Sequence, residues 1–302
     1  MAITAAEVKT LREKTGLGMM QCKKALQETE GDIEKAIENL RKQGQATAAK
    51  RAGRSAREGK VTILIDGANA VMYEVNSETD FVARNEDFLK FVEDLGPALL
   101  NEKPADITAA LALKPASFEG KSVEQRIVED LIGKIGEKIT FSRFEHIAID
   151  PATEKIFSYI HGNGRIGVIV TLASDNAEAL IADAVAELGK DIAMQIAASR
   201  PLAIDRDTAP EEIVAKEKEI YTEQVKNSGK PEKIWDKIIE GKLNKFFKEN
   251  LLIEQEFIRD TDKSVTDRIK EASKACGADL SVRWFARYEL GEGGEEETEA
   301  ES

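Results

Sequence analysis

The stretch Lys60-Val-Thr-Ile-Leu-Ile-Asp-Gly67 decides the fold, because a matching stretch, Lys155-Ile-Phe-Ser-Tyr-Ile-His-Gly162, follows later in the chain. A second apolar segment comes after each copy at the same spacing, over 71–76 and over 166–171. Apolar residues occupy alternate positions in the first of these segments, which suits a β-strand. The glycine that ends each copy allows the positive φ of a tight turn. The sequence therefore predicts two related β-hairpins.

The repeat continues beyond the hairpins. Each hairpin is followed by segments with helical spacing and then by a further strand, over 141–147 in the first copy and over 281–288 in the second. A small antiparallel sheet covered by helices is an α+β arrangement. We therefore predict an α+β fold with two related subdomains, at 60–150 and at 151–290.

The residues before the repeat are predicted to form a three-helix module, at 1–43. Thr4 and Glu7 have the spacing of a capping box at the start of the first helix. A second helix is predicted over about 19–28, and Asp32 is placed to cap a third. The stretch 44–59 that follows is basic and rich in alanine and glycine. We interpret this stretch as a charged flexible linker and as the first domain boundary.

The second subdomain is predicted to contain an antiparallel helical hairpin, over about 210–250. Pro210 and Pro231 each start a helix, and the short turn at 227–230 makes the two helices neighbours. The second helix carries a wide apolar stripe, formed by Ile234, Trp235, Ile238, Ile239, Leu243, Phe246 and Phe247. The first helix covers part of the stripe, and the remainder is expected to meet the body of the protein or another chain.

The charge of the chain is unevenly distributed. The formal net charge of the 302 residues is −13, and the segment 289–302 carries seven Glu and no Lys or Arg. We expect residues 291–302 to be an acidic disordered tail. The basic stretch 44–59 is an alternative candidate for contact with RNA. An acidic chain argues against nucleic acid as the main ligand, so we expect no direct nucleic-acid binding.

The composition is that of a cytoplasmic protein. No apolar run approaches the roughly 20 residues that span a bilayer, and the N-terminus lacks the pattern of a secretory signal. Cys22 and Cys276 are too few for a disulfide framework or a thiolate zinc site. We therefore expect no membrane association and a reducing environment.

The sequence predicts no catalytic, cofactor or metal site. The glycines of Gly162-Asn-Gly-Arg-Ile-Gly167 match the spacing of a dinucleotide-binding loop, but that loop must lead into a helix and this one leads into a strand. We interpret it as a hairpin turn. His146 and His161 have neither metal-ligand spacing nor the partners of a catalytic triad. From the residues alone, His161 is interpreted as the end of a strand.

Phe81 lies on a connection between predicted elements. The alternation of the preceding strand stops at Ser77, and a helical apolar run opens after Asn85. An aromatic ring beside Asp80 on such a loop is a plausible anchor for a pocket on a partner. The alternative interpretation is that the ring caps the local core, and the spacing favours neither.

Two long motifs identify a resemblance. The segments Leu11-Arg-Glu-Lys-Thr-Gly-Leu-Gly-Met-Met-Gln-Cys-Lys-Lys-Ala-Leu26 and Glu74-Val-Asn-Ser-Glu-Thr-Asp-Phe-Val-Ala-Arg84 resemble the two signatures of the bacterial elongation factor Ts family. The resemblance covers the whole chain, from the three-helix module to the end of the second subdomain. Ser77 and Glu78 depart from the residues that we associate with the family, and the Glu-rich tail is an addition.

The resemblance implies a guanine-nucleotide exchange factor for elongation factor Tu, in its GDP-bound and nucleotide-free forms. It implies that the segment Thr79, Asp80, Phe81 and Val82 enters the GTPase near its magnesium site and displaces the ion. It also implies partner contacts by four further residues, Met19, Met20, His161 and Gly162. The helical hairpin resembles a projecting element, and the second subdomain resembles a homodimerisation surface. The family is not an enzyme in the hydrolytic sense.

Two other classes of function remain open at this point. The N-terminal module resembles ubiquitin-associated domains, so that a peptide-binding adaptor is the main alternative. The second alternative is a nucleotide-dependent oxidoreductase that binds its cofactor through the glycine-rich turn at 162–167. The interpretation as a peptide-binding adaptor does not account for the loop at 79–82 or for the internal repeat.

Overall fold

The two predicted hairpins are present, and each belongs to a three-stranded sheet. The computed structural model describes residues 3–293. The chain divides into two compact units. The first comprises the chain up to Ile147, the segment Gly162–Ile166 and the chain from Tyr288 onward, and the second comprises Ala148–His161 and Gly167–Arg287. The fold is α+β, as the repeat predicts.

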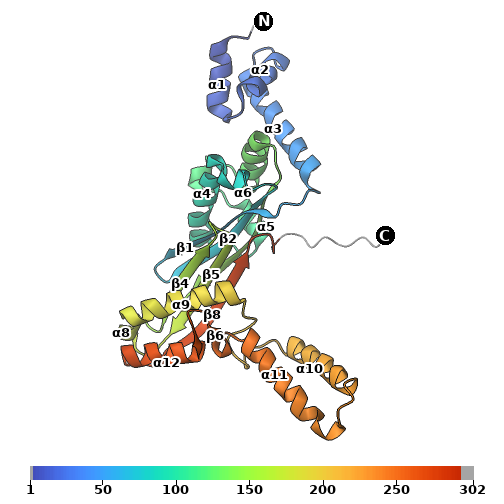
Figure 1. The fold of residues 1–302 in the computed structure, drawn as a ribbon. Helices are drawn as coiled ribbons and strands as arrows, with labels where there is room; N and C mark the ends of the chain where they lie inside the picture. Colours follow the sequence, from blue (N-terminus) through green and yellow to red (C-terminus); the bar gives the residue numbers. More distant parts are fainter. Residues whose placement is uncertain (1–2, 294–302) are drawn as a thin grey trace. The chain divides into compact units, whose positions relative to one another are not determined.

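Three helices form the N-terminal module in Figure 1, namely α1 (Ala5–Thr15), α2 (Met19–Glu28) and α3 (Ile33–Arg51). The predicted capping box is confirmed, because the Thr4 hydroxyl accepts from the Glu7 N–H and the Glu7 carboxylate accepts from the Thr4 N–H. The side chain of Asp32 caps α3 as predicted. The module has its own small core, formed by Val8, Leu11, Leu17, Cys22, Ala25, Leu26, Ala36 and Leu40.

The helix α3 continues to Arg51, so the prediction of a flexible linker from residue 44 is wrong for the first half of that stretch. Tertiary packing explains the additional turns. Gly44 lies against the π-helical segment η3 (Arg126–Ile132), where an added Cβ would meet a backbone carbonyl oxygen at 3.2 Å. Arg41 also forms an ion pair with Glu129 at 3.3 Å. The finer division of the chain into 1–43, 60–150 and 151–290 stays a prediction.

The first sheet has the order β1-β2-β3, with β1 (Glu58–Asp66), β2 (Asn69–Ser77) and β3 (Ile139–Ala148). Strands β1 and β2 are antiparallel, with Lys60 opposite Val75, and Gly67 makes the turn between them with a φ of 57°. The helix α4 (Glu86–Glu102) packs on both strands, and its start is capped by Asn85. The core beneath it contains Val71, Tyr73, Val75, Phe88, Phe91, Val92, Leu95 and Leu99.

Short helical segments complete this unit. They are η1 (Val82–Arg84), α5 (Ile107–Ala112), η2 (Ala116–Phe118), α6 (Val123–Gln125), η3 and α7 (Gly133–Ile135). Phe118 of η2 stacks on Phe91 of α4 with 5.4 Å between ring centroids. These segments therefore extend the core that α4 begins.

The second sheet repeats the strand order of the first, as β4-β5-β8. Its strands are β4 (Glu154–His161), β5 (Ile166–Ala173) and β8 (Ser281–Glu289). Apart from the helical hairpin described below, the second unit also contains α8 (Ala177–Leu180), α9 (Asp183–Ser199), η5 (Leu252–Glu254), β6 (Glu256–Phe257), β7 (Asp260–Ser264) and α12 (Val265–Cys276). Helix α9 packs on β4, where Gly189 leaves room for the ring of Phe157. The common strand order of the two three-stranded sheets supports the interpretation that the two subdomains are related.

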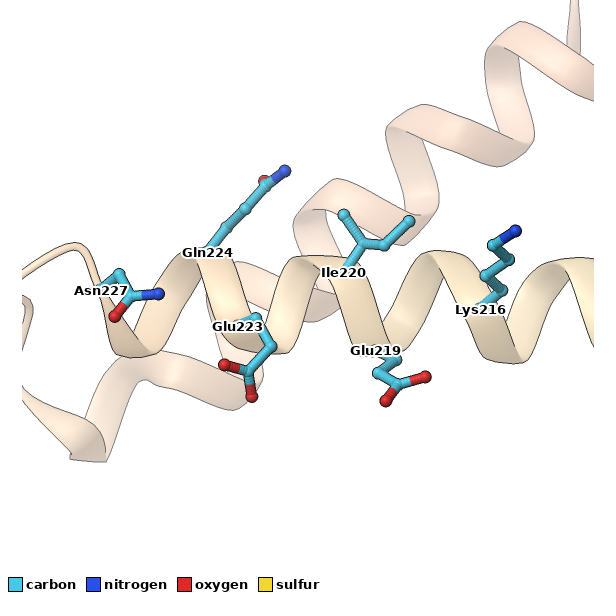
Figure 2. Close-up of a pocket in the computed structure, with 6 residues that line it drawn as sticks. All are labelled: Lys216, Glu219, Ile220, Glu223, Gln224 and Asn227. Atoms are coloured by element: carbon cyan, nitrogen blue, oxygen red, sulfur yellow. The ribbon is translucent and has the colours of Figure 1, made fainter. Parts of the chain in front are cut away.

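The predicted helical hairpin is formed by α10 (Glu211–Lys226) and α11 (Trp235–Asn250), with η4 (Glu232–Ile234) at the start of the second helix. The two helices lie side by side in Figure 1. Val225 of α10 and Ile239 of α11 are buried. A shallow pocket lies along α10. Figure 2 shows the residues that line it, in which Ile220 is the apolar residue among the polar side chains of Lys216, Glu219, Glu223, Gln224 and Asn227.

The composition predicts an acidic tail that is disordered from residue 291. Residues 294–302 lie outside the described part of the chain, so the prediction is not tested there. Residues 291–293 form a turn, and the N–H of Gly291 donates to the Glu74 carboxylate at 2.7 Å. The prediction is therefore wrong for residues 291–293, which adopt a turn that this hydrogen bond joins to Glu74.

Candidate functional site

Phe81 lies on the connection between β2 and α4, and its side chain is 80% exposed. The interpretation of Phe81 as a cap on the local core is therefore wrong. The next residue, Val82, takes that place instead, since it is only 5% exposed and belongs to the core under α4. The loop thus buries one apolar side chain and presents the other, larger one to the surroundings.

Thr79 is fixed by a carboxylate on a distant turn. Its N–H and its hydroxyl both donate to Glu137, at 3.0 Å and 2.8 Å. The hydroxyl of Ser77 donates to the Thr79 carbonyl oxygen at 2.9 Å. The backbone of the loop is therefore held immediately before Asp80 and Phe81.

Glu78 is held from two directions. Its carboxylate accepts from the guanidinium groups of Arg51 and Arg54, at 2.7 Å and 2.9 Å, and from the Lys138 N–H at 2.6 Å. Burial of the carboxyl group opposes its ionisation, but the Lys138 N–H and the two guanidinium groups outweigh this effect and lower the pKa of Glu78 to about 2. Glu78 is therefore ionised at neutral pH and ties the loop to the end of α3.

Asp80 lies on the outer side of the loop. Its carboxylate accepts a hydrogen bond from Arg84 at 2.9 Å, and both side chains are exposed to solvent over much of their surface. An exposed ion pair of this kind contributes little to stability. A partner can therefore replace the contact with Arg84 at small cost.

Met19 and Met20 open helix α2 and point away from the core of the module, with exposed fractions of 59% and 74%. Two adjacent exposed methionines form an adaptable apolar surface, because the unbranched thioether side chain can change its shape. This arrangement suits the partner contact that the resemblance implies for both residues.

His161 ends strand β4, and Gly162 begins the turn that follows with a φ of 60°. Both are exposed. The Nδ1 atom of His161 lies 3.0 Å from the Tyr159 hydroxyl, and their rings are 5.9 Å apart. Asn163 and Gly164 also have positive φ, so the glycine-rich segment is a hairpin turn as predicted. The turn leads into strand β5, and the dinucleotide-loop interpretation is thereby excluded.

A family model described as "Elongation factor TS" matches residues 78–292, which include the loop with Phe81. The chain belongs to the elongation factor Ts family. Proteins named elongation factor Ts are similar over almost the whole chain. The one from Chloroherpeton thalassium is 46% identical over 293 residues, which cover 96% of this chain and 99% of that protein. Those from Clostridium kluyveri and from strain 657 of Clostridium botulinum are 46% and 45% identical over 299 residues, which cover 98% of this chain and 95% of each relative.

Sequence reasoning missed the residues that support this loop of the elongation factor Ts fold. Glu137 contacts Thr79 across 58 residues of chain, and Arg51 contacts Glu78 across 27. The basic stretch was interpreted as a linker, and neither the spacing nor the composition of the segment around Glu137 indicates a contact with the loop. Such pairings become visible only once the fold brings the segments together.

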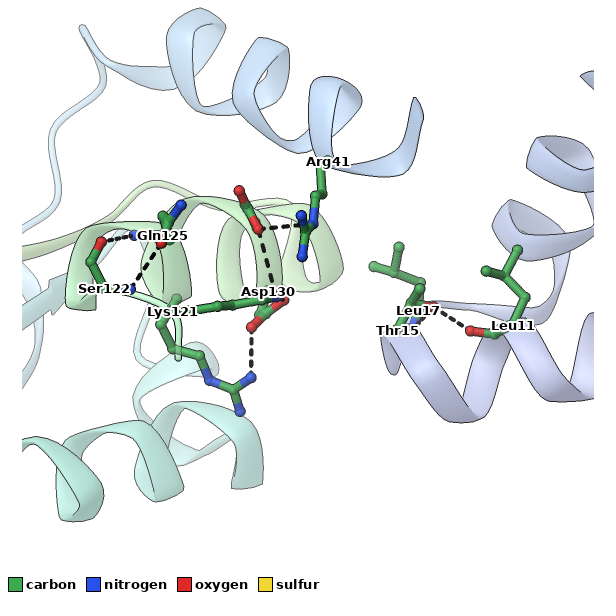
Figure 3. Close-up of polar contacts among 10 residues, drawn as sticks. Leu11, Thr15, Leu17, Arg41, Lys121, Ser122, Gln125 and Asp130 are labelled. Carbon is green, nitrogen blue, oxygen red and sulfur yellow. Dashed lines mark hydrogen bonds and ion pairs between the residues drawn. The ribbon is translucent and has the colours of Figure 1, made fainter. Parts of the chain in front are cut away.

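A polar hollow of about 660 Å³ lies beside the N-terminal module of this elongation factor Ts chain, between α1, α3 and η3. Figure 3 shows some of the side chains that line it, among them Arg41, Lys121 and Asp130. Lys121 pairs with Asp130 at 2.6 Å and Arg41 with Glu129 at 3.3 Å. The Arg41–Glu129 pair therefore links α3 to η3 across this hollow.

Two negative findings apply to residues 3–293. No group of three or more His, Cys, Asp or Glu side chains in this range is arranged to hold a metal ion. In the same range, no helix combines the length and apolar character that crossing a membrane requires.

Proposed function

We propose that this protein is a guanine-nucleotide exchange factor for elongation factor Tu, the GTPase that delivers aminoacyl-tRNA during translation elongation. The observation that carries the proposal is Phe81, an exposed ring on a loop whose neighbouring residues are fixed, within the region that matches the family. The factor makes and breaks no covalent bond. It acts by lowering the affinity of its partner for GDP, and translation implies a cytoplasmic location.

The loop from Thr79 to Val82 is proposed to act on the magnesium site of the GTPase. GTPases hold GDP partly through Mg²⁺, which bridges phosphate oxygens and protein ligands. Phe81 wedges between elements of the partner, and the Asp80 carboxylate disturbs the charges and hydrogen bonds around the ion. Mg²⁺ coordination is then lost, and GDP dissociates faster.

The energy for this effect comes from binding. Binding free energies of two ligands on one protein are coupled reciprocally, so the factor weakens GDP binding by the same ratio as GDP weakens binding of the factor. A buried aromatic anchor is worth about 2–4 kcal/mol. At about 1.4 kcal/mol for each tenfold change, this free energy corresponds to a change in GDP affinity of roughly 30-fold to 1000-fold.

Further contacts are proposed for the other elements. Met19 and Met20 bind the nucleotide domain of the partner through their apolar surface, and His161 with Gly162 supplies a second contact. The helical hairpin is proposed as a projecting element and the second subdomain as a homodimer surface. These contacts provide affinity, whereas the loop with Phe81 provides the exchange activity.

The release of a fluorescent GDP analogue from the cognate elongation factor Tu tests the proposal. The factor should accelerate release strongly in the presence of Mg²⁺. If the factor acts by displacing Mg²⁺, removal of the ion with a chelator should speed spontaneous release and shrink the additional acceleration. An equal acceleration with and without Mg²⁺ would refute the magnesium mechanism, and no acceleration in either condition would refute the function.

A further inference from the structure

The loop that carries Phe81 is clamped by the turn at Glu137 and Lys138, which leads into strand β3. The Glu137 carboxylate accepts from both donors of Thr79, with one oxygen atom for the N–H and the other for the hydroxyl. In the opposite direction, the Lys138 N–H donates to the Glu78 carboxylate. Two successive residues of the loop are thus bonded to two successive residues of the turn.

This clamp restrains the backbone directly before Asp80 and Phe81. Without it, the loop would keep the Ser77 hydroxyl bond to Thr79, the burial of Val82, the exposed pair of Asp80 with Arg84, and the pairs of Glu78 with Arg51 and Arg54. A ring on a fixed loop loses little conformational freedom when it enters a partner, whereas a ring on a mobile loop must be ordered at that moment.

We propose that Glu137 is a positioning residue for nucleotide exchange, which holds Thr79 so that Phe81 is presented in its active orientation. The inference rests on the proposed function and adds a residue outside the family motif. Glu137 itself need not touch the partner. Its effect is exerted in the step in which the ring displaces the metal, and it leaves the initial association to other surfaces.

Three variants separate the possible roles of this side chain. Glu137→Ala removes the acceptor for both Thr79 donors. Glu137→Gln keeps an oxygen atom for the Thr79 N–H, and its amide nitrogen can donate to the hydroxyl, so the geometry is retained without the charge. Glu124→Ala is the control, because Glu124 is an exposed carboxylate on α6 in the same unit.

The main readout is single-turnover release of the fluorescent GDP analogue, measured with the factor in excess over a range of concentrations. Glu137→Ala should lower the saturating release rate constant roughly tenfold, as expected from losing hydrogen bonds to a charged group. The half-saturating concentration should not change, because an interaction that matters only in the displacement step affects the rate alone. Glu137→Gln should keep most of the wild-type rate, and the control should match the wild type.

Hydrogen exchange provides a readout that does not depend on activity. The Thr79 amide should exchange faster in Glu137→Ala than in the wild type, whereas Glu137→Gln should preserve most of its protection. This measurement shows directly whether the clamp exists in solution and whether the alanine variant has opened it.

Several outcomes would overturn the inference. An unchanged saturating rate in Glu137→Ala would do so, as would unchanged protection of the Thr79 amide. A higher half-saturating concentration at an unchanged saturating rate would place the effect of Glu137 in association and not in displacement, against the inference. Equal losses in the alanine and glutamine variants, with protection kept in the latter, would indicate a direct role of the charge. A wild-type factor without exchange activity would refute the proposed function and the inference with it.

Discussion

Glu78 and Arg51 are joined by an ion pair of 2.7 Å that links the loop before Phe81 to the last turn of α3. Arg54 contributes a second pair to the same carboxylate at 2.9 Å. The basic end of α3 and the residues directly after it are therefore part of the support for the loop. In the described structure, the stretch between the three-helix module and the first sheet serves to brace the candidate site.

This pair predicts a pH-dependent contribution to stability. The folded state lowers the pKa of Glu78 from 4.5 to about 2, so its ionised form stabilises the fold above pH 4.5, and this contribution is lost as the pH falls toward 2. The free energy of unfolding of the wild type should exceed that of Glu78→Gln by about 1–2 kcal/mol near neutral pH, after allowance for screening by solvent. Denaturant unfolding at a series of pH values measures this difference, which should shrink below pH 4.5. If the difference in unfolding free energy between the wild type and Glu78→Gln stayed constant down to pH 3, the lowered pKa of Glu78 would be contradicted.

Glu74 supplies a second stability test. Its carboxylate is fully buried and accepts from Arg143, Asn76 and the Gly291 N–H. Removing one partner of a buried ion pair typically costs about 3–5 kcal/mol, so Glu74→Ala should be strongly destabilised in denaturant unfolding. The exposed control Glu124→Ala should differ from the wild type by less than about 0.5 kcal/mol. Equal stability of the two variants would show that the Glu74 network contributes nothing.

Two helical glycines should respond in opposite ways to alanine. Gly241 in α11 is exposed and has no atom within 4 Å of a Cβ placed on it. Gly241→Ala should therefore stabilise the protein by up to about 1 kcal/mol through helix propensity. A Cβ on Gly189 in α9 would meet the Phe157 ring at 2.2 Å, so Gly189→Ala should destabilise by about 1–3 kcal/mol. Thermal unfolding of both variants checks this contrast, and a stabilised Gly189→Ala would contradict the close packing of α9 on β4.

Much of the fold could be predicted because its signals are local. The capping box at Thr4, the glycine turns and the paired prolines at 210 and 231 each act within a few residues of chain. The internal repeat predicts two related subdomains with small antiparallel sheets, and the two three-stranded sheets share one strand order. The α+β class follows from these elements.

The support of the site could not be predicted in the same way. Composition indicated a flexible linker after residue 43, but the packing of Gly44 on η3 extends α3 to Arg51. The local pattern around Phe81 left its burial open, since a ring and a neighbouring valine could each have filled the core. Val82 fills this place in the core. Which of the two side chains is buried depends on contacts with distant segments, and a single sequence does not show those contacts.

The release rate of a fluorescent GDP analogue from elongation factor Tu, measured with Phe81→Ala, tests the central claim most directly. The Phe81 side chain is 80% exposed, so Phe81→Ala should fold with the stability of the wild type. Ile258→Ala is the control, because Ile258 is an exposed apolar residue that lies between β6 and β7 and has no proposed role in exchange. We predict that Phe81→Ala loses about 30-fold or more of the acceleration, as expected for an aromatic anchor worth at least 2 kcal/mol, and that the control retains it. Full acceleration by Phe81→Ala would contradict the account.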